Sequence, residues 1–288
     1  MFSLATDAAP GRPNEDFVVT TPDLAIVVDG AGVPMGGCHH GVAWYAQQLG
    51  AQTLSALSGR PDIPLTKGLY EALAAVAALH SDTCDLSDPG TPCAAVGILR
   101  IGEDTVDTLA LSDVTVMVET KQGPQITCDL RIEEISGTEP AAVEGMLFGT
   151  QEHKAAISAL VQNQTQTRNR PDGWWVAAAD PNAALHAVVH SYPRREVHRL
   201  AIFSDGATRP VDQMGLYNWP EYLDLLSNLG PARLIEHVRH IESADPDGAQ
   251  HPRTKRHDDA TLAFRCDSEA ADGPAPTTPL IDQMWQAT

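Results

Sequence analysis

Three runs of apolar residues along the chain each adjoin acidic residues. They are Leu24–Val28 before Asp29, Leu200–Phe203 before Asp205, and Ala260–Phe264 after Asp258. Runs of this length and composition are typical of buried β-strands. If the third strand runs antiparallel to the other two, its carboxylates reach the same edge of a sheet as theirs. The pattern therefore predicts that side chains far apart in the sequence lie together.

Other segments show apolar residues at helical spacing, with polar residues between them. The predicted helices are Gly41–Leu57, Thr66–Asp82, Gln151–Gln166, Trp219–Ser227 and Ala232–Ala244. The first two are apolar on one side only, so we expect both to pack on a sheet.

The middle of the chain changes to short apolar runs separated by polar turns. Strands are predicted at Ala94–Ile101, Val106–Leu111, Val114–Glu119 and Gln125–Ile132, with further strands at Trp174–Val176 and Val197–Phe203. The first 32 residues predict two more strands, with a turn at Thr21–Asp23. Short polar connections suit antiparallel hairpins, whereas parallel strands need long crossovers.

Neither an internal repeat nor a linker between two cores is visible. Because acidic motifs lie near both ends of the chain, we predict one domain over residues 1–267 that closes on itself. The segment 268–288 is rich in Ala, Pro and Thr, and we predict that it is a poorly ordered tail.

The composition excludes some classes of function. Lys and Arg total 19 against 38 Asp and Glu, for a net charge of -19. A chain with this charge does not bind nucleic acid or an anionic membrane through its overall field. No signal-peptide pattern opens the sequence, and no apolar run reaches about 18 residues. These features predict a soluble, cytoplasmic protein.

The five cysteines are scattered and form no Cys-x-x-Cys pair; they are Cys38, Cys84, Cys93, Cys128 and Cys266. We predict buried free thiols, in preference to disulfides or a zinc site. The pair His39 and His40 leaves two alternatives open. It either reaches a leaving group as a proton donor or only lines the start of the following helix.

Carboxylates gathered at one sheet edge repel one another. At a separation of about 4 Å, two of them repel by roughly 4 kcal/mol at an effective dielectric constant of 20. A cluster of three or four therefore needs a cation. Ligands that are all oxygen atoms favour a hard ion, Mg²⁺ or Mn²⁺, over zinc.

Four motifs in this order resemble the metal-dependent protein phosphatases, the PPM or type 2C serine/threonine phosphatases, and most closely their compact bacterial members. The motifs are Asn14–Asp16, Val27–Gly32, Phe203–Ala207 and Arg256–Thr261. The resemblance covers roughly Gly11 to Cys266. It implies an α+β fold, a four-layer α/β/β/α sandwich with two central antiparallel sheets flanked by antiparallel helices.

The resemblance also implies a metal site with two Mn²⁺ or Mg²⁺ ions, or three. Asp29 would bridge two ions, with the Gly30 carbonyl on one of them. Asp205 and Asp258 would bind the other ion. Asp129 is a candidate ligand for a third, weaker ion, and the alternative is an ordinary carboxylate at a strand end.

Further roles follow from the same resemblance. Asp16, with Glu15 beside it, would act largely through metal-bound water. Arg12 occupies the place of a phosphate-binding arginine, although it stands one residue closer to Asp16 than is usual in the family. Asp259 and His257 would not bind the ions themselves but would support the residues that do.

The implied activity is hydrolysis of phosphoserine and phosphothreonine in proteins, by direct attack of a water molecule that bridges the two metals. Phosphoproteins are then the partners, and a paired serine/threonine kinase is a further candidate. The segment Leu111–Thr115 departs from the family's Gly-Asp-Ser-Arg motif, and we expect this change to affect packing in the sheet, away from the phosphate. The alternative function is a phosphatase-like module that binds metal or a phosphorylated partner with little or no turnover.

Overall fold

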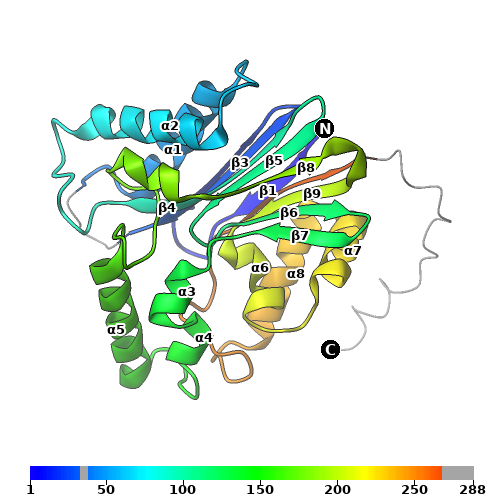
Figure 1. Ribbon diagram of the computed structural model, residues 1–288. Coiled ribbons are helices and arrows are strands. Elements are labelled where there is room, and N and C mark those ends of the chain that lie inside the picture. The colour runs from blue at the N-terminus through cyan, green and yellow to red at the C-terminus, as the bar shows by residue number, and fades with distance from the viewer. Residues whose placement is uncertain (33–37, 268–288) are drawn as a thin grey trace.

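Two antiparallel sheets of five strands each lie face to face at the centre of the molecule (Figure 1). The first sheet has the order β1 (Ser3–Asp7), β10 (Ala260–Cys266), β9 (Val197–Phe203), β6 (Thr115–Thr120) and β7 (Gly123–Thr127). The second has the order β2 (Asp16–Thr20), β3 (Leu24–Ala31), β4 (Cys93–Ile101), β5 (Thr105–Leu111) and β8 (Val188–Pro193). This computed structural model describes residues 1–32 and 38–267, so the predicted tail 268–288 lies outside the described residues.

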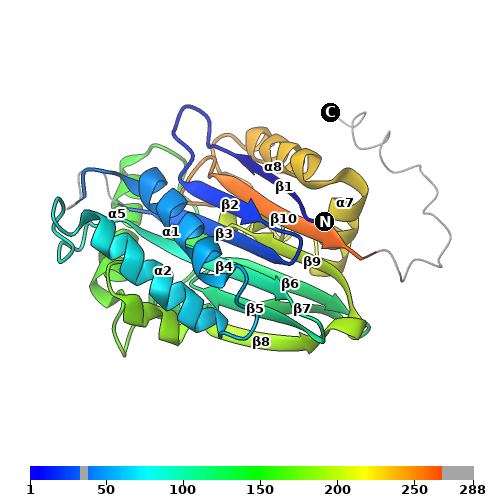
Figure 2. The same cartoon turned by 90° about the horizontal axis from the view of Figure 1, so that it is seen from above.

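Helices cover the outer faces of both sheets and complete the four predicted layers. Two helices, α1 (Val42–Leu57) and α2 (Leu65–His80), lie side by side on the second sheet (Figure 2). The first sheet is covered by α6 (Asp205–Asp212), α7 (Trp219–Leu229) and α8 (Pro231–Ala244). The remaining helices lie toward one end of the sandwich: α3 (Arg131–Ser136), α4 (Glu139–Ala142) and α5 (Gln151–Thr167). Short 3-10 turns flank β8, at Pro181–His186 and Arg194–Glu196.

The apolar runs of the sequence are continuous because the central strands are buried on both faces. Along β3, Ile26 and Val28 join the core beneath α1 and α2, while Ala25 and Val27 join the core between the two sheets. Successive side chains of a strand point to opposite faces, so both sets must be apolar. A third core lies between the first sheet and α6–α8.

The structure corrects the predicted strands in four places, one of which is the edge strand β8, absent from the prediction. The start of the chain holds three strands, and the additional edge strand β1 is mostly exposed and carries little hydrophobic pattern. β7 ends at Thr127, because the chain turns there into α3. In the Trp174–Val176 segment only Trp174 forms a bridge, an isolated one with Arg168, since Trp174 and Val176 are buried in a small core against α3 instead. Across the described ranges, no helix is both long and apolar enough to cross a lipid bilayer.

A substitution at Gly97 on β4 tests how closely the two sheets approach each other. A Cβ atom added there would lie 2.5 Å from Val114 Cγ1 and 2.7 Å from Ile202 Cγ2, both side chains of the core between the sheets. We expect Gly97→Val to lower the free energy of unfolding by about 1–3 kcal/mol, measured by urea denaturation. Leu4→Ala on the exposed edge strand is the control, expected to change it by no more than about 0.5 kcal/mol. Equal effects of the two substitutions would contradict this account of the core.

Candidate active site

Three strands bring the predicted carboxylates to one end of the sandwich. β10 runs antiparallel to β9, as expected, so the residues before β10 and after β9 lie at the same edge of the first sheet. Asp29 reaches this place from the second sheet, and its Oδ2 accepts a hydrogen bond of 3.4 Å from the backbone N–H of Asp205. The site therefore forms between the two sheets.

A cleft of about 540 Å³ opens at this end. Three of the predicted metal-binding residues line it, namely Asp29, Gly30 and Asp205. Other acidic side chains and one basic side chain also line it: Asp113, Glu133, Glu139, Asp212 and Lys255. The cleft is thus strongly acidic, with a single lysine among the described residues that line it.

Burial and mutual repulsion raise the pKa values of the central carboxylates. For Asp29, burial raises the pKa well above its usual value, and the charges of Asp16 and Asp205 raise it further. Burial, with the charge of Asp258, raises the pKa of Asp205 to about 6, against the opposing effects of Lys255 and Arg209. These side chains resist ionisation without a compensating positive charge, which is the behaviour expected of carboxylates suited to bind a cation.

Asp16 completes the central group from the neighbouring strand. It lies directly opposite Asp29 in the pairing of β2 with β3, an arrangement that is unfavourable for two charged side chains. Its Oδ2 is buried and has no hydrogen-bond partner. Burial raises the pKa of Asp16 to about 7, although hydrogen bonds from Thr261 and Ser204 lower it. A buried oxygen without a donor is a place where a cation or a bound water would be stabilising.

Asp258 is held by two basic side chains. Nζ of Lys255 lies 2.9 Å from both of its carboxylate oxygens, and Nη2 of Arg209 lies 3.0 Å from Oδ2. Arg209 is fully buried and also binds Glu242 at 2.7 Å. His257 joins this group through Nδ1, which lies 2.9 Å from Glu242 Oε2. The charge of Asp258 is therefore already balanced by residues of the chain, and this balance lowers its pKa against the effect of burial.

No family model matches the sequence, and no curated protein matches it. Among solved structures, the catalytic domain of the serine/threonine phosphatase PstP in complex with two manganese ions is similar, with a TM-score of 0.55 and 15% identity, covering 92% of this chain and 96% of that one. The chain has the fold of serine/threonine phosphatase catalytic domains.

Two further bacterial phosphatases are similar to the same extent. Stp1 from Staphylococcus aureus has a TM-score of 0.55 and 12% identity, covering 92% of this chain and 94% of that one. PppA of Pseudomonas aeruginosa, a regulatory component of T6SS, has a TM-score of 0.53 and 15% identity, with coverages of 92% and 98%. The phosphatase fold thus extends over nearly the whole of each chain, while the low identity leaves the activity to be argued from the site.

Asp259 and two glycines hold the acidic loops of this phosphatase fold in place. The carboxylate of Asp259 accepts hydrogen bonds from the backbone N–H groups of Ala9 and Glu15, at 2.7 and 2.6 Å. A Cβ at Gly30 would lie 2.4 Å from the Glu15 carbonyl oxygen, and one at Gly206 would lie 2.0 Å from that of Asp259. Gly30, which follows Asp29, and Gly206, which follows Asp205, are therefore required by close backbone contacts.

Arg12 and Glu15 lie on the exposed loop before β2. The Arg12 side chain is 58% exposed and its Nη2 lies 3.8 Å from Glu15 Oε2. Neither residue is among the described residues that line the cleft. Burial is the main reason that the pKa of Glu15 is raised. The predicted contact of Arg12 with phosphate stays a prediction.

Asp129, the candidate ligand of a third ion, is buried just beyond β7. Its two oxygens accept hydrogen bonds of 2.7 and 2.6 Å from the Arg131 guanidinium. The Asp129 carboxylate is thus neutralised by Arg131. Asp129 is not among the described residues that line the cleft. The role of Asp129 in binding a third ion stays a prediction.

Four acidic residues of the cleft were not expected from the sequence, and one of them, Asp113, lies in a segment for which the sequence predicted another role. The segment Leu111–Thr115 was predicted to affect only packing, but Ser112 and Asp113 line the same cleft as Asp29 and Asp205. Asp113 follows the end of β5, just as Asp205 follows the end of β9. Ser112 has a positive φ of 66°, which turns the chain sharply there. An apolar strand ending in Ser-Asp was the signal that could have identified this residue.

The residues present fit a hard divalent cation in their chemistry. Asp29, Asp205, Asp113 and the Gly30 carbonyl offer only oxygen ligands. The acidic side chains are, however, farther apart than the ligands of a bound ion. Among the described residues, no three of them have their oxygens all within 4.8 Å of one another. Use of Asp258 as a ligand would also require it to release Lys255.

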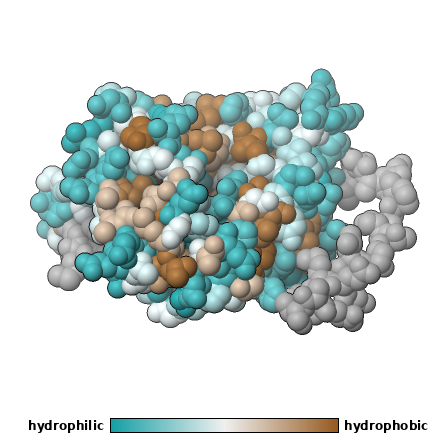
Figure 3. Space-filling model, turned by 90° about the horizontal axis from the view of Figure 1, so that it is seen from below, coloured by the Kyte–Doolittle hydropathy of each residue, from teal (hydrophilic) through white to brown (hydrophobic). Residues whose placement is uncertain are grey.

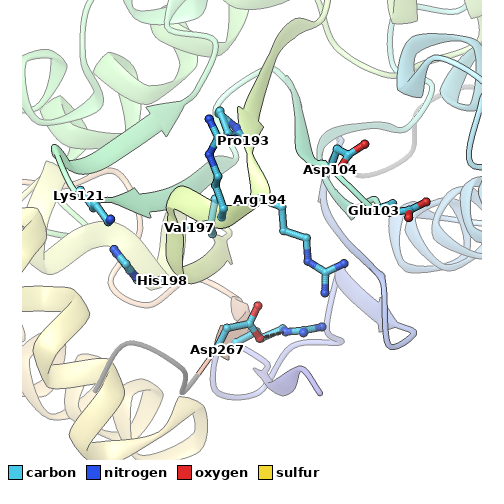
Figure 4. A pocket seen from close by; sticks show the side chains of 10 residues that line it. Glu103, Asp104, Lys121, Pro193, Arg194, Val197, His198 and Asp267 are labelled. Carbon is cyan, nitrogen blue, oxygen red and sulfur yellow. Dashed lines mark hydrogen bonds and ion pairs between the residues drawn. The ribbon is translucent and has the colours of Figure 1, made fainter. Parts of the chain in front are cut away.

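A second hollow, of about 970 Å³, lies at the opposite end of the strands (Figure 4). Both basic and acidic side chains line it, and two of the arginines already bind acceptors of the chain. Arg194 donates to the Gly102 carbonyl at 2.9 Å, and Arg265 pairs with Asp267 at 2.5 Å. This hollow lacks the grouped carboxylates of the cleft, so the cleft is the better candidate site despite its smaller volume.

The raised pKa of Asp205 predicts how pH affects the metal-free protein. Between about 4 and about 6 the folded chain binds more protons than the unfolded chain, so stability falls as pH rises through this window. Asp205→Asn removes this effect. In a chelator at pH 7 we expect the variant to be more stable than the wild type by about 1–2 kcal/mol, since partial contact with water reduces the full effect.

Urea denaturation at several pH values measures this difference. Below about pH 3 the two proteins should be equally stable, because Asp205 is then largely protonated in both states. Asp62→Asn, an exposed site with the same change in charge, should alter stability by no more than about 0.5 kcal/mol at either pH. A variant that is less stable than the wild type at pH 7 would contradict the repulsion argument.

Proposed function

We propose that this chain is a Mn²⁺- or Mg²⁺-dependent protein phosphatase that hydrolyses phosphoserine and phosphothreonine. The observation that carries the proposal is the convergence of Asp29, Gly30 and Asp205 at one acidic cleft, with the unpartnered oxygen of Asp16 beside them. The similarity of the fold to serine/threonine phosphatases, one of them bound to two manganese ions, supports the same reading.

The side chains of the cleft divide the work of such a reaction. Asp29, the Gly30 carbonyl and Asp205 would hold the ions, which supply acidification of water and neutralisation of charge on the phosphoryl oxygens. Asp16 lies opposite Asp29 and has a buried oxygen without a partner, so it would hold metal-bound water at the edge of the group. Lys255 brings a positive charge to the cleft, where it can orient an anionic phosphate.

The surroundings of the cleft favour a protein substrate. Ile126 and Leu130 line the cleft and remain 40% and 50% exposed, and two tryptophans, Trp174 and Trp219, also line it. Hydrophobic patches lie among hydrophilic residues on the face seen in Figure 3. Apolar side chains beside an anion-binding group suit the residues that flank a phosphorylated serine or threonine in a polypeptide.

A second candidate function is a phosphatase-like module that binds metal or a phosphorylated partner without efficient turnover. One observation favours it, namely that Lys255 and Arg209 occupy both oxygens of Asp258. Together they neutralise a carboxylate that the phosphatase reading assigns to a metal ion. A lysine placed among acidic residues can replace a cation electrostatically, but it cannot activate water as a divalent metal does.

Substitution of Asp29 tests whether the chain is a phosphatase with turnover or a module without it. With Mn²⁺ present, we expect the wild type to hydrolyse an aryl phosphate and a phosphothreonine peptide. Asp29→Asn should lower kcat/KM by at least about 100-fold, because it removes charge where the transferring group is stabilised. A chelator should have the same effect on the wild type, and Asp62→Asn should leave the rate unchanged. If no metal condition gives turnover although calorimetry shows that metal still binds, the result would favour the phosphatase-like module.

Lys255 provides a second test, because its ion pair with Asp258 competes with metal binding. Lys255→Met should lower the half-saturating Mn²⁺ concentration by about 10-fold, equivalent to about 1.4 kcal/mol. The exposed residue Lys67 offers a matched control, and Lys67→Met should leave this concentration unchanged. If Lys255→Met does not alter metal affinity, Asp258 does not act as a metal ligand.

A further inference from the structure

A cluster of two cysteines and two histidines lies at the ends of the α1–α2 hairpin, apart from the acidic cleft. Cys38 and His40 precede α1, His80 is the last residue of α2, and Cys84 follows it by one helical turn. One ligand atom from each of these four residues lies within 4.8 Å of those of the other three. Among the residues that the structure describes, no other group of metal-ligating side chains meets this condition.

The distances within the cluster match the edges of a tetrahedral zinc site. The Sγ of Cys38 lies 3.6 Å from Nδ1 of His40 and 3.4 Å from Nδ1 of His80, and the Sγ of Cys84 lies 3.3 Å from Nδ1 of His40. In such a site, sulfur and nitrogen ligands lie about 3.5 Å apart and two sulfurs about 3.8 Å apart. The two sulfurs here are 3.3 Å apart, so a small outward shift of one thiol would complete the geometry.

The surroundings of the cluster resemble those of a structural metal site. Cys38 is 8% exposed and His80 only 1% exposed, so these two ligands are shielded from water. The ring of Trp44 stacks on His40 at 4.3 Å and lies 5.1 Å from that of His80, which shields one side from water. A buried imidazole and a half-buried one that face two thiols make poor hydrogen-bond partners, whereas one metal ion would engage all four.

A disulfide between Cys38 and Cys84 does not account for this arrangement. Both thiols are free, and their 3.3 Å separation is far beyond the S–S bond length of about 2.05 Å. A disulfide would also leave His40 and His80 facing the sulfur atoms without a role. The convergence of both imidazoles on both sulfurs is what favours a metal.

We propose that Cys38, His40, His80 and Cys84 bind one zinc ion that is structural and distinct from the ions of the candidate active site. Binding forms two Zn–S bonds, and the two thiol protons pass to solvent, so two thiolates balance the charge of Zn²⁺. This proposal reverses the expectation from sequence that the cysteines are only free thiols. It does not depend on the proposed phosphatase activity.

The ion would join both ends of the α1–α2 hairpin. Cys38 lies six positions after Gly32, which follows the metal-binding segment of β3, so the ion would also anchor the chain where it leaves the active site. His39 is the nearest other candidate ligand, with Nδ1 at 3.5 Å from Cys84 Sγ. It is exposed and is not part of the mutually close set, so we assign it no role in binding.

Cobalt substitution of the full-length chain tests the proposal. After removal of metals under reducing conditions, addition of Co²⁺ should produce tetrahedral d–d bands and a thiolate-to-cobalt charge-transfer band that saturate at one equivalent. Zn²⁺ should then displace the cobalt. Cys84→Ser and His40→Ala should each lose or strongly shift these bands, while His39→Ala and the exposed control Cys266→Ser should keep them.

Two arms keep the test independent of folding and of the active site. Asp29→Asn should keep the charge-transfer band, because carboxylates cannot produce it, and circular dichroism should show that each variant is folded. Zinc should raise the Tm of the wild type, and Cys84→Ser should lose that increase. A wild-type protein without the band, a band retained in Cys84→Ser, or a Cys38–Cys84 disulfide whose reduction restores no metal binding would each overturn the proposal.

Discussion

Repulsion among buried carboxylates is the constraint on which the candidate site depends. Asp16 and Asp29 are paired across two strands of one sheet, and Asp205 reaches them from the other sheet. Their pKa values rise because burial removes water and each charge opposes the next. Apolar contacts between the sheets offset this cost and hold the groups in place. A divalent cation would relieve it, which is why this arrangement suits a metal enzyme.

One carboxylate at this edge is neutralised by basic side chains of the chain itself. Asp258 lies at the same edge, but Lys255 and Arg209 neutralise it, and Arg209 in turn holds the buried Glu242. Such a network is costly to break, because removal of one partner leaves a buried charge unpaired. Under the proposed function, the balance between Lys255 and a metal ion at Asp258 would separate an efficient phosphatase from a binding module of the same fold.

The α1–α2 hairpin is stabilised in a different way from the sheets. Its apolar face packs on the second sheet, while its two ends meet in the Cys38, His40, His80 and Cys84 cluster. Soft sulfur and imidazole ligands select zinc, and oxygen ligands select magnesium or manganese. A single chain can thus keep two metal sites apart by the chemistry of their ligands.

Local patterns in the sequence determined the strands that carry Asp29, Asp205 and Asp258, the helices α1 and α2, and the sandwich that the resemblance implied. Only the tertiary structure decided how these side chains are paired. Asp113 joins the cleft, Lys255 binds Asp258, Asp129 is neutralised by Arg131, and Cys38 meets Cys84 across a helical hairpin. Periodicity reports which face of an element is buried, since burial acts on each residue separately. Ion pairs and ligand clusters depend on distances between residues remote in sequence, which the chain acquires only on folding.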